Sequence, residues 1–167
     1  MSFIKNPKLI MLIGIPGSGK SRFLLGSGIT VAKQLILKEK IGGIVLSPDN
    51  LRREMTSNVS NQQVNTEVWL KIKEKTKKYL TMGNNVIIDA TNVNTKYRRE
   101  FLVGLPKCIL QAKIFKVKPE IACARIKRDL KKGKDRSNVP DEVVYRMYGE
   151  FLYTLTVLKS EGFKIIK

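Results

Sequence analysis

The chain has 167 residues, with 32 Lys or Arg against 14 Asp or Glu and a formal net charge of +18. Its length suits one domain of ordinary size, and its charge favours a polyanionic partner. There is no histidine, which excludes Ser-His-Asp hydrolysis, Cys-His proteolysis and zinc sites built on imidazole, so carboxylates must supply the acids, bases and metal ligands.

Short apolar runs alternate with stretches of helical periodicity along the chain. Strands are predicted at residues 8–13, 44–46, 86–88, 109–117 and 163–166. Continuous apolar runs are typical of parallel strands that are covered on both faces. Helical spacing marks residues 64–79, and a last helix begins at Pro140 and ends at Gly162. The polar segment 57–66 is predicted as a surface loop, and the alternation predicts an open α/β sheet with right-handed crossovers.

The segment after the first predicted strand carries a phosphate-binding motif. It reads G-I-P-G-S-G-K-S and matches the pattern G-x-x-x-x-G-K-[ST], directly after a strand and at the start of a helix. Its backbone N–H groups are expected to cradle the phosphates of ATP, Lys20 to reach the β and γ phosphates, and Ser21 to offer its hydroxyl to Mg²⁺. The residues predicted to bind the nucleotide are Gly14, Pro16, Gly17, Ser18, Gly19, Lys20 and Ser21. A plain glycine-rich turn is the alternative.

Asp89 directly follows the strand predicted at 86–88. A carboxylate at such a strand end can hold Mg²⁺ through its waters, so Asp89 is predicted as the metal-side carboxylate. The alternative role is a cap for the helix that begins near Asn94 or Thr95.

Asp49 follows the strand predicted at 44–46 and is expected to lie beside the phosphate loop, where the carboxyl ends of parallel strands meet. A carboxylate there can take the proton of an acceptor hydroxyl during phosphoryl transfer. Arg52 shares its helical face and could bind an anionic acceptor. Alternatively, Asp49 only caps a short helix at 51–55 while Arg52 is solvated.

A basic segment precedes the last predicted helix. Residues 125–138 contain seven Lys or Arg and two Asp, while Ala122, Ile126 and Leu130 form an apolar strip. We expect residues 128–138 to form a lid that closes over the triphosphate. Arg128 and Arg136 are the candidates for contact with the transferring phosphoryl group, although Lys132 competes with them. A solvated basic helix end is the alternative.

These motifs together resemble the 5′-hydroxyl polynucleotide kinases of the bacteriophage end-healing type, within the P-loop kinases. The resemblance covers residues 9–153 and rests on G-I-P-G-S-G-K-S at 14–21, S-P-D-N-L-R at 47–52, V-I-I-D-A-T-N-V-N at 86–94, R-R at 98–99 and a run at 127–148. It implies that Lys20 and Ser21 bind phosphate and metal and that Asp89 is the metal-side carboxylate. It further implies that Asp49 is the general base and that Arg52 clamps the acceptor's phosphate.

The two cysteines, Cys108 and Cys123, lack the CxxC spacing of metal and redox sites and are expected in the core of a cytoplasmic protein. No apolar run reaches the length of a membrane span. Trp69 and the tyrosines are expected to pack rather than to stack on bases.

The sequence therefore predicts one P-loop kinase domain over residues 1–167, with an open, mostly parallel sheet of about five strands, helices on both faces and a basic lid. The predicted reaction transfers the γ-phosphoryl group of ATP, with Mg²⁺, to the 5′-hydroxyl end of DNA or RNA. A small-metabolite kinase acting on a sugar acid or nucleoside is the alternative enzyme. A non-catalytic nucleic-acid-binding P-loop protein is a further alternative.

Overall fold

The computed structural model describes residues 6–26, 35–36, 43–56 and 64–167. Six strands form one sheet in the order β2-β3-β4-β1-β5-β6. The strands are β1 (Lys8–Ile13), β2 (Leu35–Ile36), β3 (Ile44–Leu46), β4 (Val86–Ile88), β5 (Ile109–Ile114) and β6 (Lys164–Ile166). All neighbouring pairs are parallel except β2 and β3, which pair antiparallel at one edge of the sheet.

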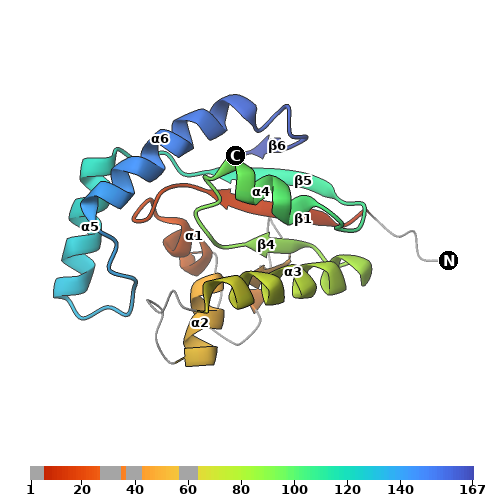
Figure 1. Cartoon of the computed structure of the whole chain (residues 1–167), viewed down its shortest axis with the longest axis horizontal. Helices are drawn as coiled ribbons and strands as arrows, with labels where there is room; N and C mark the ends of the chain where they lie inside the picture. Colours follow the sequence, from red (N-terminus) through yellow and green to blue (C-terminus); the bar gives the residue numbers. More distant parts are fainter. Residues whose placement is uncertain (1–5, 27–34, 37–42, 57–63) are drawn as a thin grey trace.

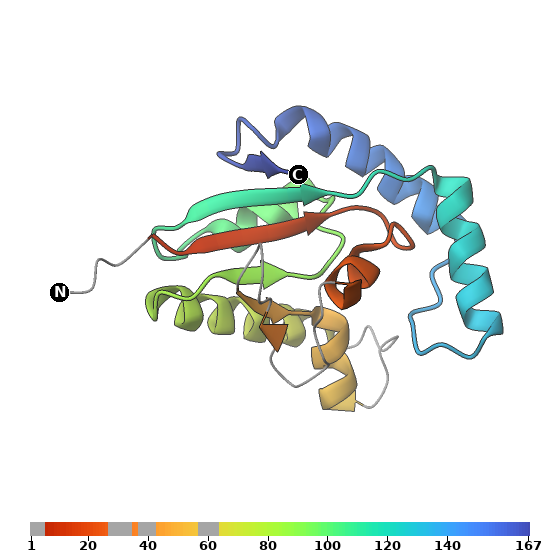
Figure 2. The same ribbon diagram turned by 180° about the vertical axis from the view of Figure 1, so that it is seen from behind.

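Helices cover both faces of this sheet. They are α1 (Lys20–Gly26), α2 (Pro48–Thr56), α3 (Asn65–Thr81), α4 (Thr95–Leu102), α5 (Pro119–Lys131) and α6 (Asp141–Val157). Helices α3, α4 and α6 lie on the face that is nearer the viewer in Figure 1, whereas α1 lies on the opposite face, which Figure 2 presents. Helix α5 stands beyond the carboxyl ends of the strands.

The central strand β1 divides the core into two clusters because alternate side chains point to opposite faces of a strand. Leu9, Met11 and Ile13 join the larger cluster with the apolar side chains of α3, α4 and α6. Ile10 and Leu12 join the smaller cluster with Leu24 of α1. Every one of these β1 side chains is fully buried, which explains why the strand reads as a continuous apolar run.

The α/β architecture predicted from the sequence is confirmed, including the mostly parallel sheet and the helices on both faces. The sheet has six strands where about five were predicted; the additional strand, β2, has only two residues and so gives no periodic signal. Strand β5 ends at Ile114 rather than at 117, since its partner β1 ends at Ile13, which pairs with Ile114.

Two predicted boundaries, one of a helix and one of a loop, also differ from those in the structure. Helix α2 begins at Pro48 rather than at residue 51, because proline fits the first helical position, where its missing N–H loses no bond. Of the predicted loop at 57–66, residues 57–63 lie outside the described residues, and α3 already begins at Asn65. Within the described residues, no helix is long and apolar enough to span a membrane.

The expected core position is confirmed for Cys123, which is buried in the larger cluster, while Cys108 is partly buried and packs against that cluster. The expectation for the aromatic side chains holds in part. Trp69 packs edge-on against Phe101, with ring centroids 5.9 Å apart. The expectation of packing was wrong for Tyr97, which is 69% exposed, and for Tyr145 and Tyr153, which are also exposed.

Candidate active site

The phosphate loop connects β1 to α1 and depends on glycine for its shape. Gly17 and Gly19 have positive φ angles of 78° and 101°, which side chains disfavour. Gly17 also lies against α5, where an added Cβ would come within 2.7 Å of the carbonyl oxygen of Ala122. A larger residue at position 17 would therefore displace either the loop or α5.

Lys20 is folded back over this loop and buried. Its Nζ donates to the carbonyl oxygens of Gly14, at 2.7 Å, and Ile15, at 2.9 Å, and to Oγ of Ser18, at 3.2 Å. Burial lowers the pKa of the Lys20 ammonium from 10.5 to about 8, although the carboxylates of Asp89 and Asp49 act in the opposite direction. A buried ammonium surrounded by loop carbonyls is ready to exchange these partners for phosphate oxygens.

Asp89 follows β4 and faces Lys20. Burial raises the pKa of its carboxyl group from 3.8 to about 6; Lys20 opposes this rise and Asp49 adds to it. The alternative capping role does not apply, because the N-cap of α4 is Asn94, whose side chain accepts a hydrogen bond from the N–H of Tyr97. Asp89 is therefore a partly desolvated carboxylate with a cation beside it.

The loop after β4 is tied to the phosphate loop. Asn92 has a positive φ of 51°, and its Nδ2 donates to the carbonyl oxygen of Leu12, at 2.8 Å, at the end of β1. One residue earlier, the carbonyl oxygen of Thr91 accepts from the N–H of Gly14, at 3.1 Å. These bonds fix the loop that carries Asp89 against the start of the phosphate loop.

The donor set at this place fits Mg²⁺. Among the described residues, no three His, Cys, Asp or Glu side chains gather into a metal-binding group. The Ser21 hydroxyl and the Asp89 carboxylate line the same cleft as Lys20, and both are hard oxygen donors. A site with so few protein ligands suits a Mg²⁺ ion that keeps waters and takes its other ligands from phosphate.

Helix α2 presents Asp49 and Arg52 on one face. The two side chains form an ion pair in which the carboxylate is 57% exposed and the guanidinium only 9% exposed. Ser47, rather than Asp49, caps the helix, since its hydroxyl accepts from the N–H of Asn50. The capping alternative for Asp49 and the solvated alternative for Arg52 are thus both wrong.

The two arginines that the sequence left in competition differ in burial: Arg128 lies on α5, and Arg136 lies in the segment after it. The Arg136 side chain is 23% exposed and donates to Oδ2 of Asp129, at 2.8 Å. Its Nε is buried without a hydrogen-bond partner in the part of the chain that the structure describes, and its charge lowers the pKa of Lys20. The Arg128 side chain, by contrast, is 60% exposed.

Two further contacts join α5 and its following segment to the site. Nη1 of Arg125 donates to the carbonyl oxygen of Gly17, at 3.2 Å. Nε of Arg53 on α2 donates to Oδ2 of Asp135, at 2.7 Å, which joins α2 to the segment after α5. Helix α5 therefore contacts the phosphate loop, and the segment after it contacts α2.

All these groups border one cleft of about 1750 Å³ at the carboxyl ends of the strands. The predicted site residues that line it are Pro16, Gly17, Ser18, Gly19, Lys20, Ser21, Asp49, Arg52, Asp89, Arg128 and Arg136. Gly14 is not among the lining residues and contributes the carbonyl that accepts from Lys20. The structure thus brings the predicted site residues together.

Three residues that contribute to this geometry were not predicted as site residues. Ser47 and Asn92 lie inside motifs that the sequence displays, S-P-D-N-L-R and D-A-T-N, but nothing in either motif indicates a hydrogen bond. Arg125 was one of seven basic residues in its segment, and only the packing of α5 on the phosphate loop distinguishes it from the others.

Comparison with known families gives a match over most of the chain. A family profile described as an AAA domain matches residues 9–152. No curated protein matches the sequence.

Several solved structures have a similar fold. A chain from the "Structure of the Pnkp1/Rnl/Hen1 RNA repair complex" aligns with a TM-score of 0.72 and 20% identity over 93% of this chain. The alignment covers 47% of that chain, so the present chain spans about half its length. A protein from Chloroflexus aurantiacus described as a kinase aligns with a TM-score of 0.60 and 15% identity over 95% of this chain and 99% of its own. At such identities the similarity shows the fold.

Proposed function

Because the chain belongs to the AAA-domain family and has a P-loop kinase fold, we propose that it transfers the γ-phosphoryl group of ATP to the 5′-hydroxyl end of DNA or RNA. The observation that supports this most strongly is the Asp49–Arg52 pair on α2. It sets a candidate base beside a candidate phosphate ligand, across the cleft from Lys20 and Asp89.

In the proposed reaction the 5′ oxygen of the acceptor forms a bond to the γ phosphorus of ATP. The bond from that phosphorus to the bridging oxygen breaks, and ADP leaves with its electron pair. The Asp49 carboxylate takes the proton of the attacking hydroxyl. Arg52 holds the acceptor through the phosphate next to that hydroxyl, with the bidentate geometry that guanidinium offers.

The nucleotide side of the reaction depends on positive charge. Lys20 and Arg136 would stabilise the charge that develops on the transferring group and the departing ADP. Ser21 and Asp89 would hold Mg²⁺, which when bound neutralises the β and γ phosphates of ATP. Arg128 is proposed only as a solvated member of the lid, because its side chain is 60% exposed.

The net charge of the molecule favours a polymer over a small metabolite. The cleft measures about 1750 Å³, more than the about 300–1000 Å³ of a pocket for one small ligand, so it has room for ATP and an acceptor together. The net charge of +18 adds an attraction for a polyanion. A chain of similar fold belongs to an RNA repair complex, which agrees with this proposal.

Acceptor-stimulated release of ADP tests the proposed function. A 5′-hydroxyl oligonucleotide should stimulate ADP release from Mg²⁺-ATP, whereas the same oligonucleotide bearing a 5′-phosphate should not. Sugar acids and nucleosides, the acceptors of the rival metabolite kinase, are assayed in parallel. Stimulation by one of these compounds alone would replace the proposal, and equal ADP release with both oligonucleotides would indicate hydrolysis instead of transfer.

A further inference from the structure

A rim with three aromatic side chains, of which Tyr97 is the exposed one, borders the acceptor side of the cleft. It consists of Trp69, Leu70 and Lys73 on α3 and Tyr97 and Phe101 on α4, all of which line the cleft. Trp69 and Phe101 pack edge to face and form its floor. Tyr97 and Leu70 remain 69% and 59% exposed. Both exposed side chains line the cleft, where they are available to a ligand that extends from the proposed acceptor site.

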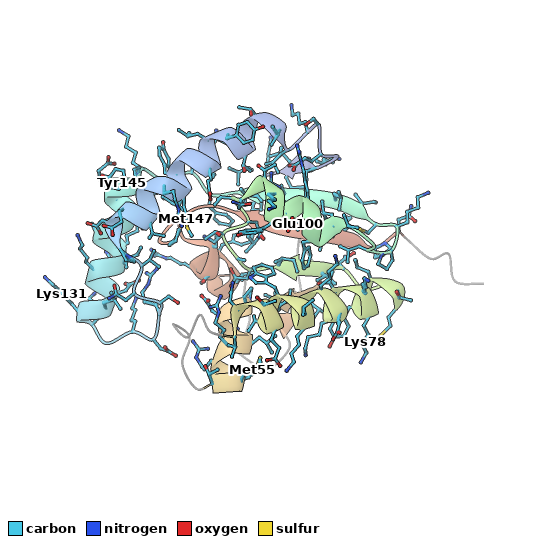
Figure 3. The ribbon with its side chains drawn as sticks, in the orientation of Figure 1. Met55, Lys78, Glu100, Lys131, Tyr145 and Met147 are labelled. Atoms are coloured by element: carbon cyan, nitrogen blue, oxygen red, sulfur yellow. The ribbon has the colours of Figure 1, made fainter. Side chains whose placement is uncertain are left out.

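Two hydrogen bonds help to hold the helices that carry the rim. Nζ of Lys73 donates to the backbone oxygen of Glu100, at 2.9 Å, which joins α3 to α4. The side chain of Asn94 accepts from the N–H of Tyr97 and so fixes the first turn of α4. Figure 3 shows Glu100 on α4 and Met147 on α6, two cleft-lining residues on the helices that flank this region.

Resting on the proposed function, we infer that this aromatic rim stacks bases of a single-stranded acceptor beyond its 5′-terminal nucleotide. The rim shares one cleft with Asp49 and Arg52, so a strand held there by its reacting end can continue along α3 and α4. Every base has a π face, and stacking on aromatic side chains binds single strands with little regard to sequence.

Charge alone does not explain binding at the rim. Lys73 and Arg146 contribute positive charge to this part of the cleft, but Glu100 and Glu150 also line it. The negative charges of Glu100 and Glu150 would partly cancel the attraction between the strand's phosphates and the two cations, whereas stacking does not depend on these charges. The contribution of the rim should therefore depend little on salt, unlike that of Arg52.

Tyr97→Ala tests this inference, because the exposed ring can be removed without opening the core. We expect the KM for a 5′-hydroxyl oligonucleotide to rise about tenfold, on the scale of one lost base–aromatic stack. The KM for a nucleoside 3′-phosphate, which has no further base, should stay within about twofold. Tyr97→Phe keeps the ring and should behave like the unchanged protein.

A matched control and a binding readout complete the test. Tyr145→Ala removes another exposed tyrosine, one that lies where α6 passes α5 and outside the cleft, and should change neither KM (Figure 3). An oligonucleotide that is abasic beyond its first nucleotide should bind the unchanged protein and Tyr97→Ala equally. A 2-aminopurine placed beyond the first nucleotide should be quenched on binding the unchanged protein and less so on binding Tyr97→Ala.

The outcomes separate this inference from the proposed function. If the oligonucleotide is an acceptor but Tyr97→Ala leaves its KM and the 2-aminopurine signal unchanged, the rim serves packing or a protein contact and the inference is wrong. If Tyr97→Ala raises the KM of both acceptors equally, Tyr97 does not act beyond the terminal nucleotide. If the unchanged protein phosphorylates no oligonucleotide, the proposed function fails first.

Discussion

Asp49 is the residue on which the proposed chemistry depends most. It lies in the first turn of α2, paired with Arg52, while Ser47 caps the helix. The i,i+3 spacing alone predicted that Asp49 and Arg52 share a face, because that relation is local to a helix. The distinction between a cap and a base could not be predicted, since it depends on where the helix begins.

Asp49→Asn should lower the rate of phosphoryl transfer without weakening nucleotide binding. The amide keeps the shape of the side chain but cannot accept the proton, so transfer should fall by about 10²–10⁴-fold. Affinity for Mg²⁺-ATP and the melting temperature should change little, because the Asn amide oxygen can still accept from the buried Arg52 guanidinium. Asp135→Asn, which removes another exposed carboxylate with an arginine partner, is the control. Full transfer by Asp49→Asn would exclude Asp49 as the base.

The ionised Asp89 carboxylate should destabilise the folded protein, and the pH dependence of the unfolding free energy should show this. Its pKa is about 6 when folded against the usual 3.8, so the folded state binds this proton more tightly than the unfolded chain does. The free energy of unfolding should therefore fall as pH rises from about 4 to about 6 and remain lower above that range.

Asp89→Asn should remove this dependence. At about 1.4 kcal/mol per pKa unit, the unchanged protein should lose on the order of 2 kcal/mol of unfolding free energy between pH 4 and pH 7 that the variant does not lose. Denaturant unfolding at several pH values, without Mg²⁺ or nucleotide, measures the difference. A variant whose stability falls with pH as steeply as that of the unchanged protein would show that the pKa of Asp89 is not raised in the folded state.

At the scale of elements, the site is the meeting place of the phosphate loop, the loop after β4, α2 and the segment after α5. The strands and long helices were predictable because their apolar periodicity reflects burial on one or both faces. The contacts between elements could not be predicted from this periodicity. Arg125 reaches Gly17 only because α5 packs on the phosphate loop, and the choice between Arg128 and Arg136 depends on Asp129 and Lys20.

Arg136→Ala and Arg128→Ala form a matched pair that tests this choice. Arg136→Ala should lower kcat by about 10²-fold or more, the scale of a lost electrostatic group at a transferring phosphoryl. It should leave the KM of the acceptor nearly unchanged. Arg128→Ala removes an equal charge from an exposed position and should lower kcat less than about threefold. The reverse order would make Arg128 the residue that contacts the transferring group.

At the scale of the whole molecule, the charge of +18 predicts strong salt dependence for a polymeric acceptor. The acceptor KM should rise with salt with a log–log slope of about 0.7 per phosphate contact of a single strand. Arg52→Ala should reduce that slope by about 0.7, the value for one phosphate contact. It should also weaken binding of a nucleoside 3′-phosphate. Steady-state titrations over a range of salt concentrations measure both, and a salt-independent acceptor KM would favour a small metabolite.

Transfer of label in direct competition tests the central claim most directly. The protein is incubated with Mg²⁺ and γ-labelled ATP in one mixture of a 5′-hydroxyl oligonucleotide, sugar acids and nucleosides, and the labelled oligonucleotide is then digested to mononucleotides. We predict that the label enters the oligonucleotide and is recovered as the 5′-phosphate of its terminal nucleotide, and that Asp49→Asn abolishes this product. Label recovered in a sugar acid or a nucleoside, with none in the oligonucleotide, would contradict the claim.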